Sequence, residues 1–172
     1  ITAGEHDILL FSSAGKSIRF RESDVRSVGR TAIGVRGIRL ADKDRVVSLI
    51  VAESDDPILT ATEKGYGKRT QLDEYRAQAR GGSGVISIKT SDRNGQVVGA
   101  IQVTDEDEMM LISDKGTLVR ARAADVSIIG RNTQGVTLIN IADDEALVSV
   151  AKIAETDDDE EGADEIEVTS EE

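Results

Sequence analysis

Short runs of apolar residues, separated by polar stretches, recur along this chain. Ile8 to Phe11, Val35 to Leu40 and Val46 to Val51 are runs of this kind and are rich in β-branched residues. Runs of this length with turn-forming residues at their ends predict β-strands. Apart from the acidic C-terminal tail, no stretch keeps the period of a long helix, and residues 23–26 and 73–76 predict at most a short helical turn. We therefore predict an all-β body.

Two glycine motifs each occur three times in the same register. The first, which runs from Ile8 to Arg19 in the first repeat, contains Gly15, Gly65 and Gly116. The second, which runs from Gly29 to Val35, contains Gly34, Gly84 and Gly135, so both sets of glycines are spaced by 50 and 51 residues. The first set lies where a tight hairpin needs a positive φ, and Asn94-Gly95 is a further strong turn signal. Two motifs with the same spacing predict three tandem repeats of about fifty residues.

Each repeat has room for about four strands, and this architecture is typical of blades arranged around an axis. Closed discs usually have about four to eight blades, so three blades predict part of a larger disc or an open one. The first residue is Ile1 rather than Met, which favours a piece of a longer protein.

Charge divides the chain into two parts. The net charge is −12, but eleven acidic residues and no basic ones lie between Glu155 and Glu172, so residues 1–154 carry 22 acidic and 21 basic residues. We predict that residues 1–154 form the bladed body and that residues 155–172 form a disordered, solvated acidic tail. An alternative is that the tail mimics phosphate and competes for a basic surface.

The basic residues of the body fall into register between repeats. Arg19, Arg69 and Arg120 share one column, Arg30, Arg80 and Arg131 share a second, and Arg21 and Arg122 share a third with Gln71 between them. One interpretation is that basic residues at strand edges prevent aggregation. The other is that they line one rim of the disc and follow a phosphate backbone. The predicted DNA-binding residues are Lys16, Arg19, Arg21, Arg30, Arg36, Lys68, Arg69, Arg76, Arg80, Lys115, Arg120, Arg122 and Arg131.

The aromatic content favours duplex over single-stranded nucleic acid. Single-strand binders stack bases on aromatic rings, and this chain has no Trp and only Phe11, Phe20, Tyr66 and Tyr75. DNA laid on a convex rim must bend, which costs on the order of 1 to 6 kcal/mol for a site of about 20 to 30 base pairs.

Little in the chain suggests catalysis. There is no Cys, and His6 is the only histidine, so neither a His-dependent nucleophile nor a zinc site is expected. We expect no metal or cofactor, no membrane segment and a cytoplasmic location. A protein-binding propeller of the WD or kelch type is the rival from another class, and the absence of Trp argues against it.

Residues 29–38, Gly-Arg-Thr-Ala-Ile-Gly-Val-Arg-Gly-Ile, followed by residues 65–70, closely resemble the C-terminal domain of bacterial DNA gyrase A. The resemblance covers all three repeats and reaches the tail. It implies a six-bladed β-pinwheel, of which this chain is the C-terminal half. It also implies a basic rim that wraps duplex DNA, so that the whole enzyme introduces negative supercoils.

The same resemblance implies the partners. They are duplex DNA, the rest of gyrase A and, through it, gyrase B in a heterotetramer associated with the bacterial chromosome. The cleaving tyrosine, ATP and Mg²⁺ belong to other parts of that enzyme, so no cofactor is expected here.

Residues 78–84 resemble a degenerate copy of the glutamine-led basic box of that family. The copy keeps Gln78, Arg80, Gly81, Gly82 and Gly84. Ala79 and Ser83 stand where the full box has Lys or Arg, which implies weaker binding. The C-terminal domain of topoisomerase IV, which has similar blades without the box, is the alternative within the same family, and the partial box favours gyrase.

Overall fold

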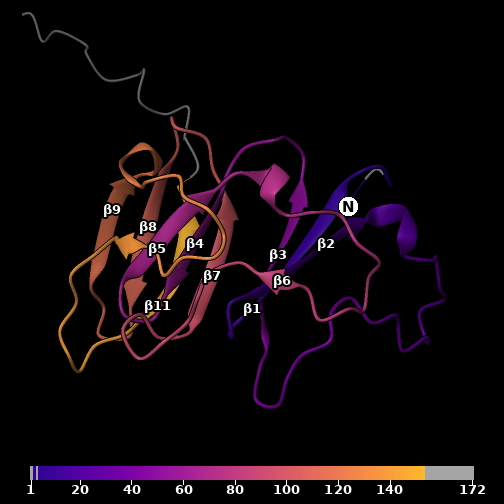
Figure 1. Cartoon of the computed structure of the whole chain (residues 1–172), viewed down its shortest axis with the longest axis horizontal. Coiled ribbons are helices and arrows are strands. Elements are labelled where there is room, and N and C mark those ends of the chain that lie inside the picture. The colour runs from indigo at the N-terminus through magenta and orange to yellow at the C-terminus, as the bar shows by residue number, and fades with distance from the viewer. Residues whose placement is uncertain (1, 3, 154–172) are drawn as a thin grey trace, which may run out of the picture.

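The computed structural model describes residue 2 and residues 4–153, and the predicted tail at 155–172 lies outside them. The described residues form three antiparallel sheets, which we call blades 1 to 3, with three one-turn 3₁₀ helices between strands (Figure 1). None of the helices in this part of the chain is long and apolar enough to cross a membrane. The prediction of an all-β, bladed body is confirmed.

Each blade is built on a hairpin and a third strand from one repeat, and blades 1 and 2 add a fourth strand from the next repeat. Blade 1 has the order β3-β1-β2-β6, blade 2 the order β10-β5-β4-β7, and blade 3 the order β11-β8-β9. The strands are β1 (Asp7–Ser12), β2 (Lys16–Arg21), β3 (Val46–Ala52), β4 (Ile58–Thr62), β5 (Tyr66–Thr70), β6 (Val85–Ile86), β7 (Val97–Gln102), β8 (Glu108–Ser113), β9 (Leu118–Arg122), β10 (Val136–Thr137) and β11 (Leu147–Lys152). The 3₁₀ helices η1 (Glu22–Asp24), η2 (Leu72–Glu74) and η3 (Ala123–Asp125) follow the three hairpins.

Both glycine motifs are explained by backbone geometry. Gly15, Gly65 and Gly116 turn the hairpins with φ values of 78°, 75° and 87°, a region in which a side chain is strained. Gly84 has a φ of 68°, and a Cβ there would lie 2.2 Å from the carbonyl oxygen of Ser17. Glycine therefore allows the second repeat to approach the edge of blade 1.

The strand that crosses to the preceding blade is only two residues long. β6 pairs with β2 through Ser17 and Val85, and β10 pairs with β5 through Gly67 and Val136. The equivalent residues of the first repeat, Val35 and Arg36, form no strand, so the predicted strand from Val35 to Leu40 is wrong. The physical reason is that no sheet among the described residues precedes blade 1, and the segment has no partner strand.

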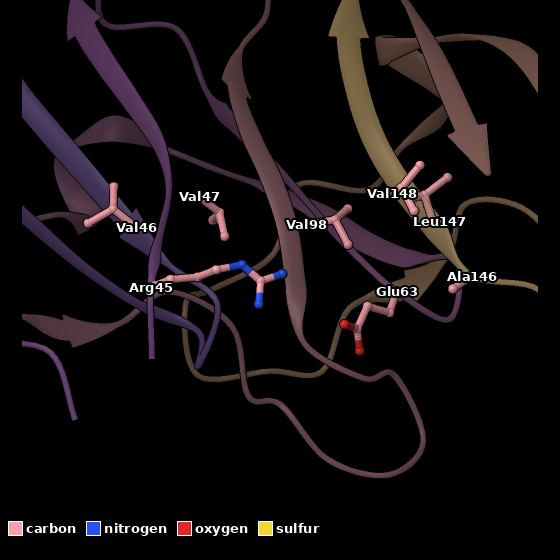
Figure 2. Close-up of a pocket in the computed structure, with 8 residues that line it drawn as sticks. All are labelled: Arg45, Val46, Val47, Glu63, Val98, Ala146, Leu147 and Val148. Atoms are coloured by element: carbon pink, nitrogen blue, oxygen red, sulfur yellow. The ribbon is translucent and has the colours of Figure 1, made fainter. Parts of the chain in front are cut away.

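The third strands β3, β7 and β11 lie side by side at the inner edges of the blades. The backbone N–H of Ala100 on β7 donates to Ser48 Oγ on β3 at 2.9 Å, and a Cβ on Gly99 would lie 3.0 Å from Val150 of β11. A cavity of about 400 Å³ opens between them, lined by valines of all three strands and by Arg45 and Glu63 (Figure 2). The opposite edges, formed by β6, β10 and β9, therefore face outward.

Apolar residues between the blades form the core. Phe11 of blade 1 and Tyr75 of the second repeat meet edge to face with 5.8 Å between ring centroids, and each is 1% exposed. Leu59 and Met109 are fully buried in the equivalent cluster between blades 2 and 3. The blades are therefore held together by burial of apolar surface from adjacent repeats.

Candidate nucleic-acid interface

Arg19 and Arg69 connect one blade to the next. The Nη1 of Arg19 donates to the carbonyl oxygens of Leu72 and Tyr75 at 2.9 and 3.3 Å, and its Nε donates to Asp7 at 2.7 Å. Arg69 is 4% exposed, and its Nε donates to the carbonyl oxygen of Val126 at 2.8 Å. Each side chain thus extends from a hairpin strand to the 3₁₀ helix of the following repeat.

The expectation that this column faces the outer rim is wrong for Arg19 and Arg69. Their guanidinium groups are committed to carbonyl oxygens between blades, where a phosphate cannot approach them without breaking those bonds. Arg120 differs because no described repeat follows blade 3. Its side chain is 64% exposed and pairs with Glu108 on the same blade.

Lys68 is fully buried, so its prediction as a rim cation is also wrong. Its Nζ donates to the carbonyl oxygens of Gly130 and Arg131, both at 2.6 Å, and to Thr133 Oγ1 at 3.2 Å. The equivalent residues are Ile18 and Val119, which are apolar. Burial lowers the pKa of Lys68 to about 8, while Glu74 opposes this shift and Arg131 adds to it.

The lowered pKa of Lys68 predicts that the stability of the protein depends on pH. Between about pH 8 and its ordinary pKa of 10.5, the folded protein has released this proton and the unfolded chain still holds it. The free energy of unfolding of the wild type, relative to the Lys68→Ile variant, should therefore rise by up to about 1 kcal/mol per pH unit over this range. Urea unfolding of both proteins from pH 7 to about pH 10 measures the difference. A difference that falls with pH would contradict the assignment.

The second column of arginines lies partly exposed against the preceding repeat. Arg80 donates to the carbonyl oxygens of Asp24 and Arg36 at 2.9 and 3.1 Å. Arg131 donates to the carbonyl oxygen of Ile86 at 2.8 Å, which is the equivalent contact one repeat later. Arg30, the first member of the column, is exposed.

The other predicted residues are dispersed. Lys16 is half-buried, Arg21 is exposed and pairs with Asp7, Lys115 pairs with Asp144, and Arg122 pairs with Asp125. In the degenerate box, Gly81 and Gly84 have positive φ values, and the half-buried Gln78 has a buried Nε2 without a hydrogen-bond partner in the described part of the chain. The box packs on the outer edge of blade 1, where the backbone N–H of Arg39 donates to the carbonyl oxygen of Gly82 at 2.8 Å.

Six exposed cations gather on the outer segments of the first two repeats. Within the described residues, none of their side chains makes an ion pair or a hydrogen bond. We call them the rim cations: Arg26, Arg30, Arg36, Arg39, Arg76 and Lys89. They lie on residues 25–39 and 75–89. These two segments are in contact, because the backbone N–H of Arg39 donates to the carbonyl oxygen of Gly82. Neither segment contains an acidic residue.

Sequence reasoning identified three of these six residues and missed Arg26, Arg39 and Lys89. The signal available was the density of cations rather than their recurrence between repeats. Residues 25–39 hold four cations and no acids, residues 75–89 hold three cations and no acids, and residues 126–140 hold only Arg131. The cations of these segments are therefore most numerous in the first two repeats, and the equivalent segment of the third repeat has only one.

Each repeat also matches a known family. Residues 6–53, 56–104 and 107–154 match the family described as "DNA gyrase C-terminal domain, beta-propeller". The chain belongs to this family. The three matched ranges coincide with the three sequence repeats and confirm the predicted resemblance and the repeat length.

The chain is also similar in sequence to individual gyrase proteins. The chain is 58% identical over 161 residues to the DNA gyrase A protein of Klebsiella oxytoca, which covers 94% of this chain and 18% of that protein. It is 56% identical over 160 residues to the DNA gyrase A protein of Escherichia coli K12, and this alignment covers 93% of this chain and 18% of that protein. This chain thus spans about a fifth of the length of these gyrase proteins.

Solved structures show the same blades. The structure of a DNA gyrase A C-terminal domain superposes with a TM-score of 0.81 at 31% identity, covering 87% of this chain and 51% of that domain. The C-terminal domain of a DNA topoisomerase IV superposes with a TM-score of 0.83 at 27% identity, covering 88% of this chain and 48% of that domain. The blades of this chain thus have the fold of these C-terminal domains.

Proposed function

We propose that this chain is a non-catalytic module of DNA gyrase A that binds duplex DNA on its outer edge and bends it. The rim cations supply the contact, chiefly on blade 1 and on the adjoining part of the second repeat. The observation that carries the proposal is that the exposed rim cations lie on two adjoining segments, residues 25–39 and 75–89, and that neither segment contains an acidic residue. Neutralising phosphates with such cations releases counterions, which drives binding that is independent of base sequence.

The placement of the aromatic residues supports a duplex rather than a single strand as the ligand. Three aromatic residues are at most 3% exposed: Phe11, Phe20 and Tyr75. Their rings therefore offer no face on which bases could stack. Only Tyr66 is partly accessible, and the guanidinium of Arg93 lies over its ring at 5.0 Å from the centroid. Stacking of successive bases needs several open rings, and this chain presents at most one.

The shape of the outer edge supports bending. Rim cations lie on adjoining segments of two repeats, which the backbone bond between Arg39 and Gly82 joins. We propose that a duplex that contacts both segments curves around this edge. Smooth bending costs on the order of 1 to 6 kcal/mol for a site of about 20 to 30 base pairs, which several phosphate contacts can offset. In the whole enzyme, we propose that this curvature contributes to negative supercoiling in complex with the rest of gyrase A and with gyrase B in the bacterial cytoplasm.

The proposal predicts steep salt dependence of DNA binding. If the six rim cations each contact one phosphate, affinity for a short duplex should fall roughly a thousandfold between about 50 and 200 mM salt. Fluorescence anisotropy with duplexes of unrelated sequence measures this, with a single strand of the same length as the comparison. Binding that is weak at low salt, or that varies with base sequence, would contradict the proposal.

Bending is measured separately from binding. A duplex labelled at both ends should show increased energy transfer when the protein is saturating, because the ends approach one another. Tight, salt-dependent binding without a change in energy transfer would support the proposed DNA contact but contradict the proposed bending.

A further inference from the structure

The two ends of blades 1 and 2 differ in charge. We call residues 13–15, 41–45, 63–65 and 90–96 the hairpin ends, and residues 22–24, 53–56, 72–74 and 104–107 the helix ends. The helix ends hold ten acidic residues and no Lys or Arg. The hairpin ends hold four acidic and four basic residues, so they are neutral. A polyanion can therefore approach the hairpin ends more easily than the helix ends.

The outer segments with the rim cations join these two ends. Residues 25–39 follow η1 and reach the hairpin of blade 1, where the backbone N–H of Ser13 donates to the carbonyl oxygen of Arg45 at 2.8 Å. Residues 75–89 follow η2 and reach the hairpin of blade 2, where the backbone N–H of Glu63 donates to the carbonyl oxygen of Gln96 at 2.9 Å. The rim cations thus lie between acidic helix ends and neutral hairpin ends.

Two cations of the hairpin ends share the distribution of the rim cations among the repeats. Lys43 and Arg93 occupy equivalent positions in the first two repeats, where the third repeat has Asp144. The rim cations Arg39 and Lys89 are also equivalent to each other, and in the third repeat a neutral Asn takes their place. The cation column at Lys43 and Arg93 therefore continues the pattern of the outer segments.

The turn that carries Lys43 is held firmly against the hairpin of blade 1. Asp44 Oδ1 accepts hydrogen bonds from Ser13 Oγ and from the backbone N–H of Ala14, both at 2.9 Å. Lys43 has a φ of 62° and is the only non-glycine residue with a positive φ in the part of the chain that the structure describes. A residue with a Cβ is strained in this conformation, and such strain is often found at functional positions.

The loop that carries Arg93 is also fixed in place. Asn94 is fully buried, and its Nδ2 donates to the carbonyl oxygens of Lys89 and Gln134 at 2.8 and 3.1 Å. The guanidinium of Arg93 lies over the ring of Tyr66, 5.0 Å from its centroid. Contact with a ligand would therefore cost little ordering of this loop.

Both cations are available to a ligand. Lys43 and Arg93 are exposed, and neither side chain makes an ion pair within the described residues. Arg93 is exposed although the second repeat has a described blade on each side. The other two cations of the hairpin ends differ, because Lys64 donates to the carbonyl oxygen of Asp92 and Arg45 lines the cavity at the inner edge (Figure 2).

We propose that Lys43 and Arg93 are further phosphate contacts, which lead the duplex from the rim cations toward the hairpin ends. This inference rests on the proposed function and adds a direction to the path of the DNA. The acids of the helix ends oppose the other direction, because unscreened charges act over about 8 Å at physiological ionic strength. The duplex thus has an attractive border on one side of the rim cations and a repulsive border on the other.

The direction of the path can be measured with a cleaving probe. The chain has no Cys, so an iron chelate can be attached at one chosen position. Ser23→Cys places it at a helix end and Ala41→Cys at a hairpin end, and these two exposed residues flank the same outer segment. A chelate at residue 41 should cut bound duplex several times more strongly than one at residue 23. Equal cutting, or stronger cutting from residue 23, would overturn the inference.

Salt dependence tests the two cations themselves. A variant with Lys43→Asn and Arg93→Gln keeps a residue that tolerates positive φ at position 43. If two phosphate contacts are lost, its fall in affinity between about 50 and 200 mM salt should be roughly tenfold smaller than that of the wild type. Fluorescence anisotropy measures both proteins. Melting temperatures close to that of the wild type show that the loss is not caused by unfolding.

Arg45→Gln is the matched control. Arg45 is also an exposed cation of a hairpin end without an ion pair in the described chain, but it lies at the inner edge. Its replacement should leave the salt slope unchanged, whereas Arg93→Gln alone should reduce the slope of log affinity against log salt by about one. Equal effects of Arg45→Gln and Arg93→Gln would overturn the inference, because DNA would then respond to the total charge of the hairpin ends.

Failure of this inference is distinguishable from failure of the proposed function. If duplex binding is steeply salt-dependent and requires the rim cations, but the variant with Lys43→Asn and Arg93→Gln keeps the wild-type slope, the proposed function stands and the inference is overturned. If the wild type does not bind duplex at low salt, the proposed function fails, and the inference fails with it.

Discussion

Replacing Arg69 by Ala should lower the free energy of unfolding by about 3 kcal/mol. The guanidinium is 4% exposed and bonds Val126 across the joint between blades 2 and 3, so its loss leaves a buried carbonyl oxygen without a donor. It also leaves a cavity between two blades. For a domain of this size, the melting temperature should fall by roughly 10 °C. Differential scanning calorimetry or urea unfolding measures the change.

Arg120→Ala is the matched control for Arg69→Ala. It occupies the same position in the third repeat, but its side chain is 64% exposed and pairs only with Glu108. Exposed pairs contribute up to about 1 kcal/mol, so the melting temperature should hardly change. Equal losses for the two variants would show that Arg69 does not act through the joint to the following repeat.

Much of the fold is predictable because its signals are local. The hairpin glycines Gly15, Gly65 and Gly116 report positive φ values directly, and short β-branched runs report strands. The repeat length followed from the spacing of these glycines, and it defines the blades. What local signals do not show is that β6 and β10 cross to the preceding blade, since two-residue strands have no pattern of their own.

The candidate site was harder to predict because recurrence of a residue has two causes. Arg19 and Arg69 recur because each joint between blades needs a donor for the carbonyl oxygens of the next 3₁₀ helix. These oxygens come from residues more than fifty positions away, and the sequence does not show on which side of the strand they lie. Arg26, Arg39 and Lys89 do not recur in all repeats, so the register between repeats does not reveal them.

Removing four rim cations should weaken duplex binding far more than removing four paired cations. In the first variant, Arg26, Arg30, Arg36 and Arg39 become Ala, and in the second, Lys115, Arg120, Arg122 and Lys152 become Ala. Each cation of the second set pairs with an acidic residue on the third repeat. Both variants change the net charge by the same amount, so any difference between them reports the position and the ion pairing of the removed cations rather than total charge.

The dependence of binding on salt separates these two effects. If each rim cation contacts one phosphate, the first variant should reduce the slope of log affinity against log salt by about four, and the second should reduce it by less than about one. Fluorescence anisotropy over a range of salt concentrations measures both slopes. Parallel losses in the two variants would mean that DNA responds to the overall charge of the chain. A loss confined to the first variant would support contact between the duplex and the unpaired cations on the outer edge of blade 1, because the two variants remove the same net charge.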